Sequence, residues 1–388
     1  MMPDTASDRR ALADRLQESG VLTHPEWRAA VEAVPRELFL QPGVFLPTDV
    51  GRWLPVTAFG TGPKEWSEIA YRDESLVTQL DGHLTADRTA EPVPGVPTSS
   101  STTPVTVVGM VEALDVEDGH TALEIGTGTG YSTALMCHRL GEDNVTTIEV
   151  DPGVAARADA ALEAAGYSTW TVTGDGLLGH PRRAPYDRVI ATCAVRRIHH
   201  TWVRQTKPGG TILAPGSWAY GTGLAKVTVN EDGTAEGRII GESSFMQARS
   251  QAVVPLAGDL SARTAYTDSE RAAKVPPALL EEWMPAFLAQ LATPGAQLVH
   301  ATRGDGHRQL YVFDADRESF AAFTENGSGW TVRQGGPVTL WDDIQRALIA
   351  WHDAGRPDVS AMRLRITPRS HMYWIDGSPA LRWEHRLA

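Results

Sequence analysis

A glycine-rich loop between an apolar strand and a helix carries the clearest chemical signal in the chain. It is the sequence LEIGTGTGY of residues 123–131. Gly126 and Gly128 allow the backbone to approach a ligand closely, and Gly130 allows the helix to pack against the strand. A dinucleotide-binding fingerprint requires glycine at its sixth position, where this loop has Tyr131, so NAD or FAD fits poorly.

Acidic residues accompany this loop at the ends of the next two predicted strands. Glu149 ends the next strand, about 20 residues after the glycines, where a carboxylate accepts the two hydroxyls of a ribose. Asp175 lies between two glycines at the end of the third strand, where an acid can meet an adenine amino group. Each acid alone could equally be a solvated strand-end carboxylate. Three acids in register with one loop, Glu124 included, favour a binding site.

The loop and the carboxylate before it resemble motif I of S-adenosylmethionine (SAM) methyltransferases. The resemblance implies SAM as the cofactor and S-adenosylhomocysteine as its product, with a nucleotide-dependent oxidoreductase as the weaker alternative. The expected cofactor-binding residues are Glu124, Gly126, Thr127, Gly128, Thr129, Gly130, Tyr131, Glu149, Gly174, Asp175 and Gly176.

Alternating strands and helices must position these residues. Apolar runs predict strands at 121–125, 145–149, 168–173, 187–193 and 211–214, and helices at 105–114, 131–140 and 152–165. Such alternation predicts a doubly wound, Rossmann-like α/β domain with a parallel sheet. Residues 224–229 and 237–240, joined by a turn, predict an antiparallel hairpin at one edge of that sheet.

The regions on either side of this domain have a different character. Helices are expected at 11–18 and from Pro25, residues 37–80 read as irregular, and residues 92–104 have a linker-like composition. From about residue 251 a separate α+β unit is expected, with helices at 277–291 and 340–352 and strands at 297–302, 309–313, 363–367 and 371–375. We therefore expect an N-terminal region contributing to the site (1–104), a methyltransferase domain (105–250) and a substrate-recognition domain (251–388).

Several motifs in a fixed order resemble the protein-L-isoaspartate O-methyltransferases, over roughly residues 27–247. They are VPRELF at 34–39, YRD at 71–73, the Ser/Thr-Pro segment ending at Pro104, the glycine loop, APYD at 184–187, QTKPGGT at 205–211 and APG at 214–216. The resemblance implies methylation of a peptide carboxylate, and in the repair enzymes the ester then collapses to a succinimide. It also implies a serine two residues before a proline, close to the reacting methyl group.

This chain has Thr102 at that serine position, with Ser101 before it and Thr103 after it. Thr102 or Ser101 is expected to orient the substrate carboxylate, and Thr103 to contact the substrate; the alternative is a merely polar loop. A carboxylate is ionised at neutral pH, so catalysis needs positioning and desolvation but no general base.

Other polar residues are weaker candidates for the substrate site. Asp73 is expected either to shape the peptide groove or to cap a helix or turn. Arg196 or Arg197 is expected to attract a peptide carboxylate. His199 and His200 are neighbours without an accompanying carboxylate cluster, so no metal site is expected.

The C-terminal region is unusually rich in tryptophan and arginine. Half of the 12 tryptophans follow residue 280. A recognition surface is expected from Trp341, Trp351, Trp374 and Trp383 with Arg356, Arg363, Arg365 and Arg369. The alternative is a tryptophan-stabilised lid or dimerisation domain.

The layout is similar to a branch of the family that tailors ribosomally made peptides, including graspetides and lanthipeptides. That resemblance implies esterification of an Asp or isoAsp carboxylate that then collapses to aspartimide or isoaspartate. A general isoaspartate repair enzyme with an accessory domain is the alternative, and a non-catalytic peptide-binding module is the third hypothesis.

Composition limits the remaining possibilities. The 388 residues suggest two or three domains, and 42% hydrophobic with 21% charged residues is a globular balance. A net charge of -13 argues against nucleic acid and anionic membranes as partners. The segment from Arg356 onward is locally basic, with six arginines against three acids, and is expected to attract a peptide substrate rich in Asp and Glu. No apolar run approaches a membrane span, and no signal peptide is expected. Cys137 and Cys193 are expected to be buried thiols of a cytoplasmic protein.

Overall fold

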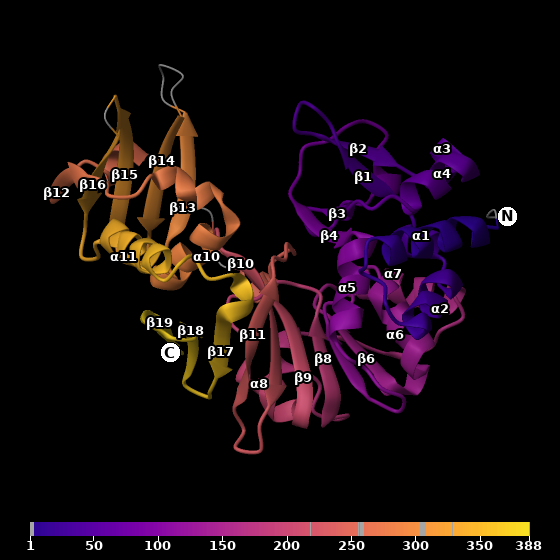
Figure 1. Cartoon of the computed structure of the whole chain (residues 1–388). Coiled ribbons are helices and arrows are strands. Elements are labelled where there is room, and N and C mark those ends of the chain that lie inside the picture. The colour runs from indigo at the N-terminus through magenta and orange to yellow at the C-terminus, as the bar shows by residue number, and fades with distance from the viewer. Residues whose placement is uncertain are drawn as a thin grey trace. The chain divides into compact units, whose positions relative to one another are not determined.

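The computed structural model describes residues 4–217, 219–254, 256, 260–302, 308–327 and 329–387, which form two compact units (Figure 1). The first unit comprises the residues up to 193 together with 199–214 and 228–233. The second comprises 194–198, 215–227 and the residues from 234 onward. The three-part division expected from the sequence remains a prediction.

The first unit begins with two helices and a small antiparallel sheet. The elements are α1 (Ala6–Glu18), α2 (Pro25–Ala33), η1 (Arg36–Leu40), β1 (Val44–Pro47), β2 (Trp53–Val56), α3 (Ala58–Thr61), α4 (Pro63–Ala70), β3 (Leu76–Leu80), η2 (Ala86–Arg88) and β4 (Pro97–Ser101). The strand order is β2-β1-β3-β4. Phe45, Val77 and Leu80 form the core of this region, with Trp53 and Val93 packed against them.

One expectation for this region is wrong, because residues 37–80 contain strands and helices. The segment 92–104, which is linker-like by composition, contains strand β4. The strands of this sheet have only four or five residues each, too few for an alternating apolar pattern to stand out among glycines and prolines.

The remainder of the first unit is the expected α/β arrangement. Its elements are α5 (Pro104–Ala113), β5 (Ala122–Ile125), α6 (Tyr131–Leu140), η3 (Glu142–Asn144), β6 (Val145–Glu149), α7 (Pro152–Ala164), β7 (Trp170–Thr173), η4 (Gly176–Leu178), β8 (Tyr186–Ala191), α8 (His200–Gln205) and β9 (Thr206–Ser217). The strands pair in parallel in the order β9-β8-β5-β6-β7. Parallel pairing brings the carboxyl ends of these strands to one edge, where ligands bind in such folds.

The second unit contains two antiparallel sheets and two longer helices. Its elements are β10 (Thr222–Val229), β11 (Ala235–Gly241), η5 (Arg249–Gln251), α9 (Leu260–Arg263), β12 (Ser269–Ala272), η6 (Pro277–Glu281), α10 (Trp283–Ala292), β13 (Gln297–Thr302), β14 (Arg308–Asp314), β15 (Ser319–Asn326), β16 (Gly329–Gly335), α11 (Leu340–Asp353), η7 (Val359–Ala361), β17 (Met362–Ile366), β18 (Ser370–Ile375) and β19 (Ser378–Arg386).

One sheet of the second unit has the order β12-β16-β15-β14-β13, and α10 packs against α11. The expected hairpin is β10 and β11, and the last three strands extend it in the order β19-β18-β17-β11-β10. The pairing of residues 235–238 with 363–366 shows that the C-terminal strands return to the hairpin. Among the described residues no helix is both long and apolar enough to cross a membrane.

Candidate active site

The glycine loop joins β5 to α6 with three left-handed residues. The φ angles are 96° at Gly126, 55° at Gly128 and 91° at Gly130, a region that favours glycine. A Cβ on Gly128 would lie 3.7 Å from the carbonyl oxygen of Ser100, and one on Gly130 would lie 3.4 Å from the Ala158 Cβ. The loop therefore lies between β4, which carries the Ser/Thr segment, and helix α7.

The carboxylate of Glu124, in β5 just before the glycine loop, is buried. Glu124 is 0% exposed and accepts hydrogen bonds from the hydroxyls of Ser132 and Thr133, each at 2.5 Å, and of Thr147 at 2.8 Å. The hydroxyls of Thr147 and Thr127 lie 2.7 Å apart, so Thr127 also faces inward. Burial raises the pKa of Glu124 to about 7.

The side chains of Glu124 and Thr127, two residues of the expected cofactor set, point into the fold. The side chains of Glu124 and Thr127 belong to an internal hydroxyl–carboxylate network, because every residue of β5 is buried on both faces of the parallel sheet. Their place is to brace the loop, and direct contact with a ligand is not what this geometry supports. Tyr131 also points inward, with its ring 5.9 Å from that of Phe39.

Glu149 lies at the carboxyl end of β6, beside the loop. One carboxylate oxygen accepts the backbone N–H of Gly128 at 2.9 Å, and the other accepts the N–H of Asp151 at 3.1 Å. Asp151 in turn caps α7 by accepting the N–H groups of Gly153 and Val154. The negative charge expected at a ribose subsite is thus held in place by two backbone donors.

Residues 174–176 follow directly after strand β7. The N–H of Gly174 donates to the Glu149 carbonyl oxygen at 2.8 Å. A Cβ on Gly176 would lie 2.5 Å from Ile125 Cγ2, so only glycine fits against β5 there. Asp175 is exposed and caps η4 through the N–H of Leu177 at 3.0 Å. Glu149 thus contacts the loop through Gly128, and Asp175 adjoins Gly176, which packs against Ile125 just before the loop.

The Ser/Thr segment places its three hydroxyls in different surroundings. Ser101 is 3% exposed, and its oxygen accepts a hydrogen bond from Arg36 at 3.4 Å. Thr102 is partly exposed, and the structure gives its hydroxyl no partner among the described residues. Thr103 caps α5 and donates to the Thr106 hydroxyl at 2.8 Å. Thr102 is therefore the hydroxyl best placed to meet a substrate.

Asp73, Arg196 and Arg197 are the remaining substrate candidates. Asp73 accepts the N–H of Val105 at 2.9 Å, which makes it a cap of helix α5. Arg196 and Arg197 belong to the second unit, where their exposed side chains extend from a backbone held by Gln251.

The side chains of the neighbouring histidines contact groups of the backbone. His199 caps α8, and His200 contacts the Gly233 carbonyl oxygen at 3.0 Å. Within the described ranges, no group of three or more His, Cys, Asp or Glu could hold a metal ion. Cys137 is buried as expected, whereas Cys193 is only partly buried beside the loop, where desolvation raises the pKa of its thiol to about 12.

Sequence reasoning missed three residues that shape the site. Arg36 contacts the Ser/Thr segment, Thr192 donates its hydroxyl hydrogen to the Gly126 carbonyl oxygen, and Gln79 reaches the Asp151 carboxylate at 3.3 Å. The only signal for Arg36 was its place in the motif VPRELF of residues 34–39, where it precedes Glu37 between apolar residues. Nothing in the sequence distinguishes Thr192 or Gln79 from other strand residues.

The cluster fits SAM by its chemistry. The loop glycines have the positive φ angles that bring backbone N–H groups close to a ligand, and the Glu149 carboxylate is held at the strand end where a ribose acceptor is expected. An exposed acid at the third strand end suits an adenine amino group.

The family model described as "Protein-L-isoaspartate(D-aspartate) O-methyltransferase (PCMT)" matches residues 63–252. The protein-L-isoaspartate O-methyltransferase of Ignicoccus hospitalis is 34% identical over 209 residues, which are 53% of this chain and 81% of the relative. This chain belongs to the protein-L-isoaspartate O-methyltransferase family. The Hyperthermus butylicus member is 30% identical over 67% of this chain and 93% of its own length.

A solved structure titled protein-L-isoaspartate O-methyltransferase has the same fold, with a TM-score of 0.52 and 20% identity. The alignment covers 97% of this chain and 99% of that one. As a member of the family, the chain is a SAM-dependent protein carboxyl methyltransferase, and SAM is its cofactor.

Proposed function

We propose that the chain transfers the methyl group of SAM to the free carboxylate of isoaspartyl residues in proteins and peptides. The observation that carries this proposal is the placement of the Ser/Thr segment beside the glycine loop. The Ser100 carbonyl oxygen lies within van der Waals reach of a Cβ built on Gly128. The unpartnered hydroxyl of Thr102 follows two residues later, at the end of β4.

Methyl transfer to an ionised carboxylate requires the protein mainly to position the two reactants. Bound SAM supplies a methyl carbon on a positively charged sulfur. A carboxylate oxygen forms a bond to that carbon while the carbon–sulfur bond breaks, and the bonding electron pair remains on the sulfur of S-adenosylhomocysteine. No proton has to leave the substrate, because its carboxylate is already ionised at neutral pH. In this proposal Thr102 donates a hydrogen bond that directs one carboxylate oxygen towards the methyl group.

Two peptides that differ only in the linkage of one residue test the proposal. With SAM present, the isoaspartyl peptide should gain a methyl ester and release an equal amount of S-adenosylhomocysteine. The ordinary aspartyl peptide should remain unmodified at the same enzyme concentration. Equal methylation of both peptides, or of neither, would overturn isoaspartyl selectivity.

The narrower function, tailoring of a ribosomally made Asp- and Glu-rich peptide through aspartimide, depends on the second unit. Its exposed cations are the observation in its favour: Arg369 is exposed, and Arg356 is exposed with its guanidinium 5.8 Å from the Trp351 ring centroid. We propose that residues 251–388 recognise substrate through such groups.

Other members of the expected recognition surface serve the fold. Trp341 is fully buried against Phe323, with ring centroids 4.7 Å apart. Arg363 pairs with Asp376 at 2.8 Å, and Arg365 pairs with Glu236 at 2.9 Å.

The general isoaspartyl activity is better supported than tailoring. The solved structure with the isoaspartate title aligns with almost the whole chain, so a fold of this extent is not peculiar to tailoring enzymes.

A further inference from the structure

Arg36 is a charged side chain that the fold buries completely. It begins η1, is 0% exposed and is among the largest fully buried side chains of the described residues. Arginine is seldom buried to this extent without an acidic partner. The structure gives Arg36 no ion pair with any described residue, and its nearest carboxylate neighbours are engaged elsewhere.

Those neighbours are Glu37 and Asp73. The Glu37 carboxylate accepts hydroxyls from Thr5 at 2.7 Å and Tyr71 at 2.5 Å. Asp73 accepts the N–H of Val105 and is exposed. Burial lowers the pKa of Arg36 to about 10, so the guanidinium still carries its charge at neutral pH.

The guanidinium connects two segments that are far apart in the sequence. One terminal nitrogen donates to the carbonyl oxygens of Ala70 at 2.5 Å and Arg72 at 3.0 Å. The other donates to the Glu74 carbonyl at 3.3 Å, the Ser101 hydroxyl oxygen at 3.4 Å and the Thr102 carbonyl at 3.1 Å. The planar fork of arginine can reach these acceptors together, which an ammonium group cannot do.

These contacts have a direct consequence for the Ser/Thr segment. Because Ser101 accepts a hydrogen bond from Arg36, its own hydroxyl hydrogen is available to donate away from the guanidinium. Because the Thr102 carbonyl is held, the peptide plane that follows Thr102 is fixed in orientation. The same buried cation thus binds the Ser101 hydroxyl and the backbone of Thr102.

We propose that Arg36 is the positioning residue of the Ser/Thr segment and that its charge, which forms no ion pair with a described residue, is complemented by the substrate carboxylate. This inference rests on the proposed function for the identity of that carboxylate. The negative charge of the substrate declines as its oxygen bonds to the methyl carbon. The charge of Arg36 should therefore lower the KM for the peptide. The hydrogen bonds by which Arg36 holds the Ser/Thr segment should instead raise kcat.

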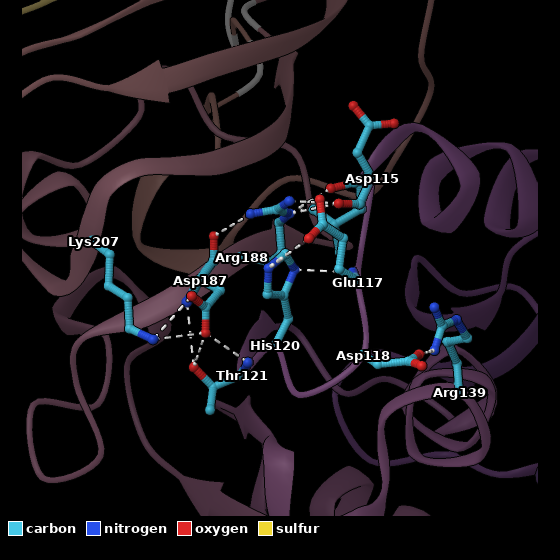
Figure 2. A network of polar contacts seen from close by, with 10 residues as sticks. Asp115, Glu117, Asp118, His120, Thr121, Arg139, Asp187, Arg188 and Lys207 are labelled. Atoms are coloured by element: carbon cyan, nitrogen blue, oxygen red, sulfur yellow. Dashed lines mark hydrogen bonds and ion pairs between the residues drawn. The ribbon is translucent and has the colours of Figure 1, made fainter.

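Arg188 provides a matched control in the same unit (Figure 2). It is also buried, and its guanidinium donates to the backbone carbonyls of Leu114 at 2.8 Å and of Asp115, with the Nε–O distance to Asp115 being 3.0 Å. It pairs with Ala122 at the beginning of β5, away from the carboxyl end where the glycine loop starts. Substitution of Arg188 removes comparable contacts without touching the Ser/Thr segment.

The kinetic experiment compares Arg36→Lys, Arg36→Gln and Arg188→Lys in the full chain, with an isoaspartyl peptide as the methyl acceptor. Both Arg36 variants should lose roughly 10- to 100-fold in kcat, because the fork that fixes the hydroxyls is gone. Arg36→Gln should also raise the peptide KM about tenfold or more relative to Arg36→Lys, which keeps the charge. SAM affinity, measured by calorimetry, should stay within about twofold of wild type in all three.

Amide hydrogen exchange measures the positioning role without any substrate. Arg36→Lys should lose protection at residues 99–103 while residues 122–126 keep theirs, and Arg188→Lys should leave 99–103 protected. Unchanged exchange at 99–103 in Arg36→Lys would overturn the positioning role, even if the wild type failed to methylate the peptide and the proposed function itself were wrong. In an active wild type, unchanged kcat, or equal peptide KM in the two Arg36 variants, would overturn the inference.

Discussion

Replacing Glu149 by glutamine tests the carboxylate at the end of β6 with the smallest change of shape. In the structure both oxygens accept backbone N–H groups, from Gly128 at 2.9 Å and Asp151 at 3.1 Å. An amide has only one oxygen, so one of these N–H groups will face an NH2 group that cannot accept. The ribose hydroxyls also lose a charged acceptor, which contributes about 1.5–3 kcal/mol for a hydrogen bond of this kind.

That free energy corresponds to a roughly 10- to 150-fold weaker affinity for SAM. Titration calorimetry with SAM and with S-adenosylhomocysteine measures it directly, at equal protein concentration and pH. Thermal unfolding of each ligand-free variant should accompany the titration, since the unpaired N–H group also lowers stability by about 1–3 kcal/mol.

Glu142→Gln is the matched control for this substitution. Glu142 is a partly exposed acid that accepts the N–H of Ser168 at 2.9 Å, just before β6 begins. The control should leave SAM affinity unchanged. If Glu149→Gln binds SAM as tightly as Glu142→Gln does, the ribose is held elsewhere and the reasoning from strand ends is wrong.

Three further predictions address other parts of the molecule. Burial raises the pKa of Glu124 to about 7, so the folded state favours the protonated carboxyl group. The free energy of unfolding of the wild type should therefore fall by about 3 kcal/mol as the pH rises from 4 through 7. Denaturant titrations of Glu124→Gln should show a weaker pH dependence. Thr102→Ala should lower kcat roughly tenfold or more with SAM affinity intact, and Thr102→Ala with Ser101→Ala should lower it further; full turnover in the double variant would make the segment a mere loop. Replacing both Arg356 and Arg369 by serine should raise KM for an acidic peptide but not for a neutral isoaspartyl peptide, and equal effects on both would remove the second unit from recognition.

Long apolar elements of the fold could be predicted from the sequence. The helix at 131–140 and the strand at 145–149 agree with the structure residue for residue. The helix lies between Gly130 and Gly141, and the strand is a buried run of β-branched residues that ends in Glu149. The small sheet of β1 to β4 could not be predicted. Its short strands are stabilised by contacts such as Phe45 with Val77, which are distant in sequence and leave no periodic pattern.

The site was predictable only to the level of strand ends. Parallel pairing explains why Glu149 and Asp175 meet the glycine loop, since the ends of neighbouring strands share one edge. The Glu124 side chain points inward because three hydroxyl groups donate hydrogen bonds to it. The role of Arg36 depends on its hydrogen bonds to segments about 35 and 65 residues further along the chain. Neither set of tertiary contacts can be inferred from the spacing of residues along the chain.

The central claim is that this chain esterifies an isoaspartyl carboxylate with the methyl group of SAM. The most direct measurement is mass spectrometry of an isoaspartyl peptide and its aspartyl counterpart after incubation with the enzyme and SAM carrying a deuterated methyl group. We predict one deuterated methyl group on the isoaspartyl carboxylate, in the same molar amount as the S-adenosylhomocysteine formed, and none on the aspartyl peptide. A label on any other atom of the peptide, or an aspartyl peptide labelled as fast as the isoaspartyl one, would contradict the claim.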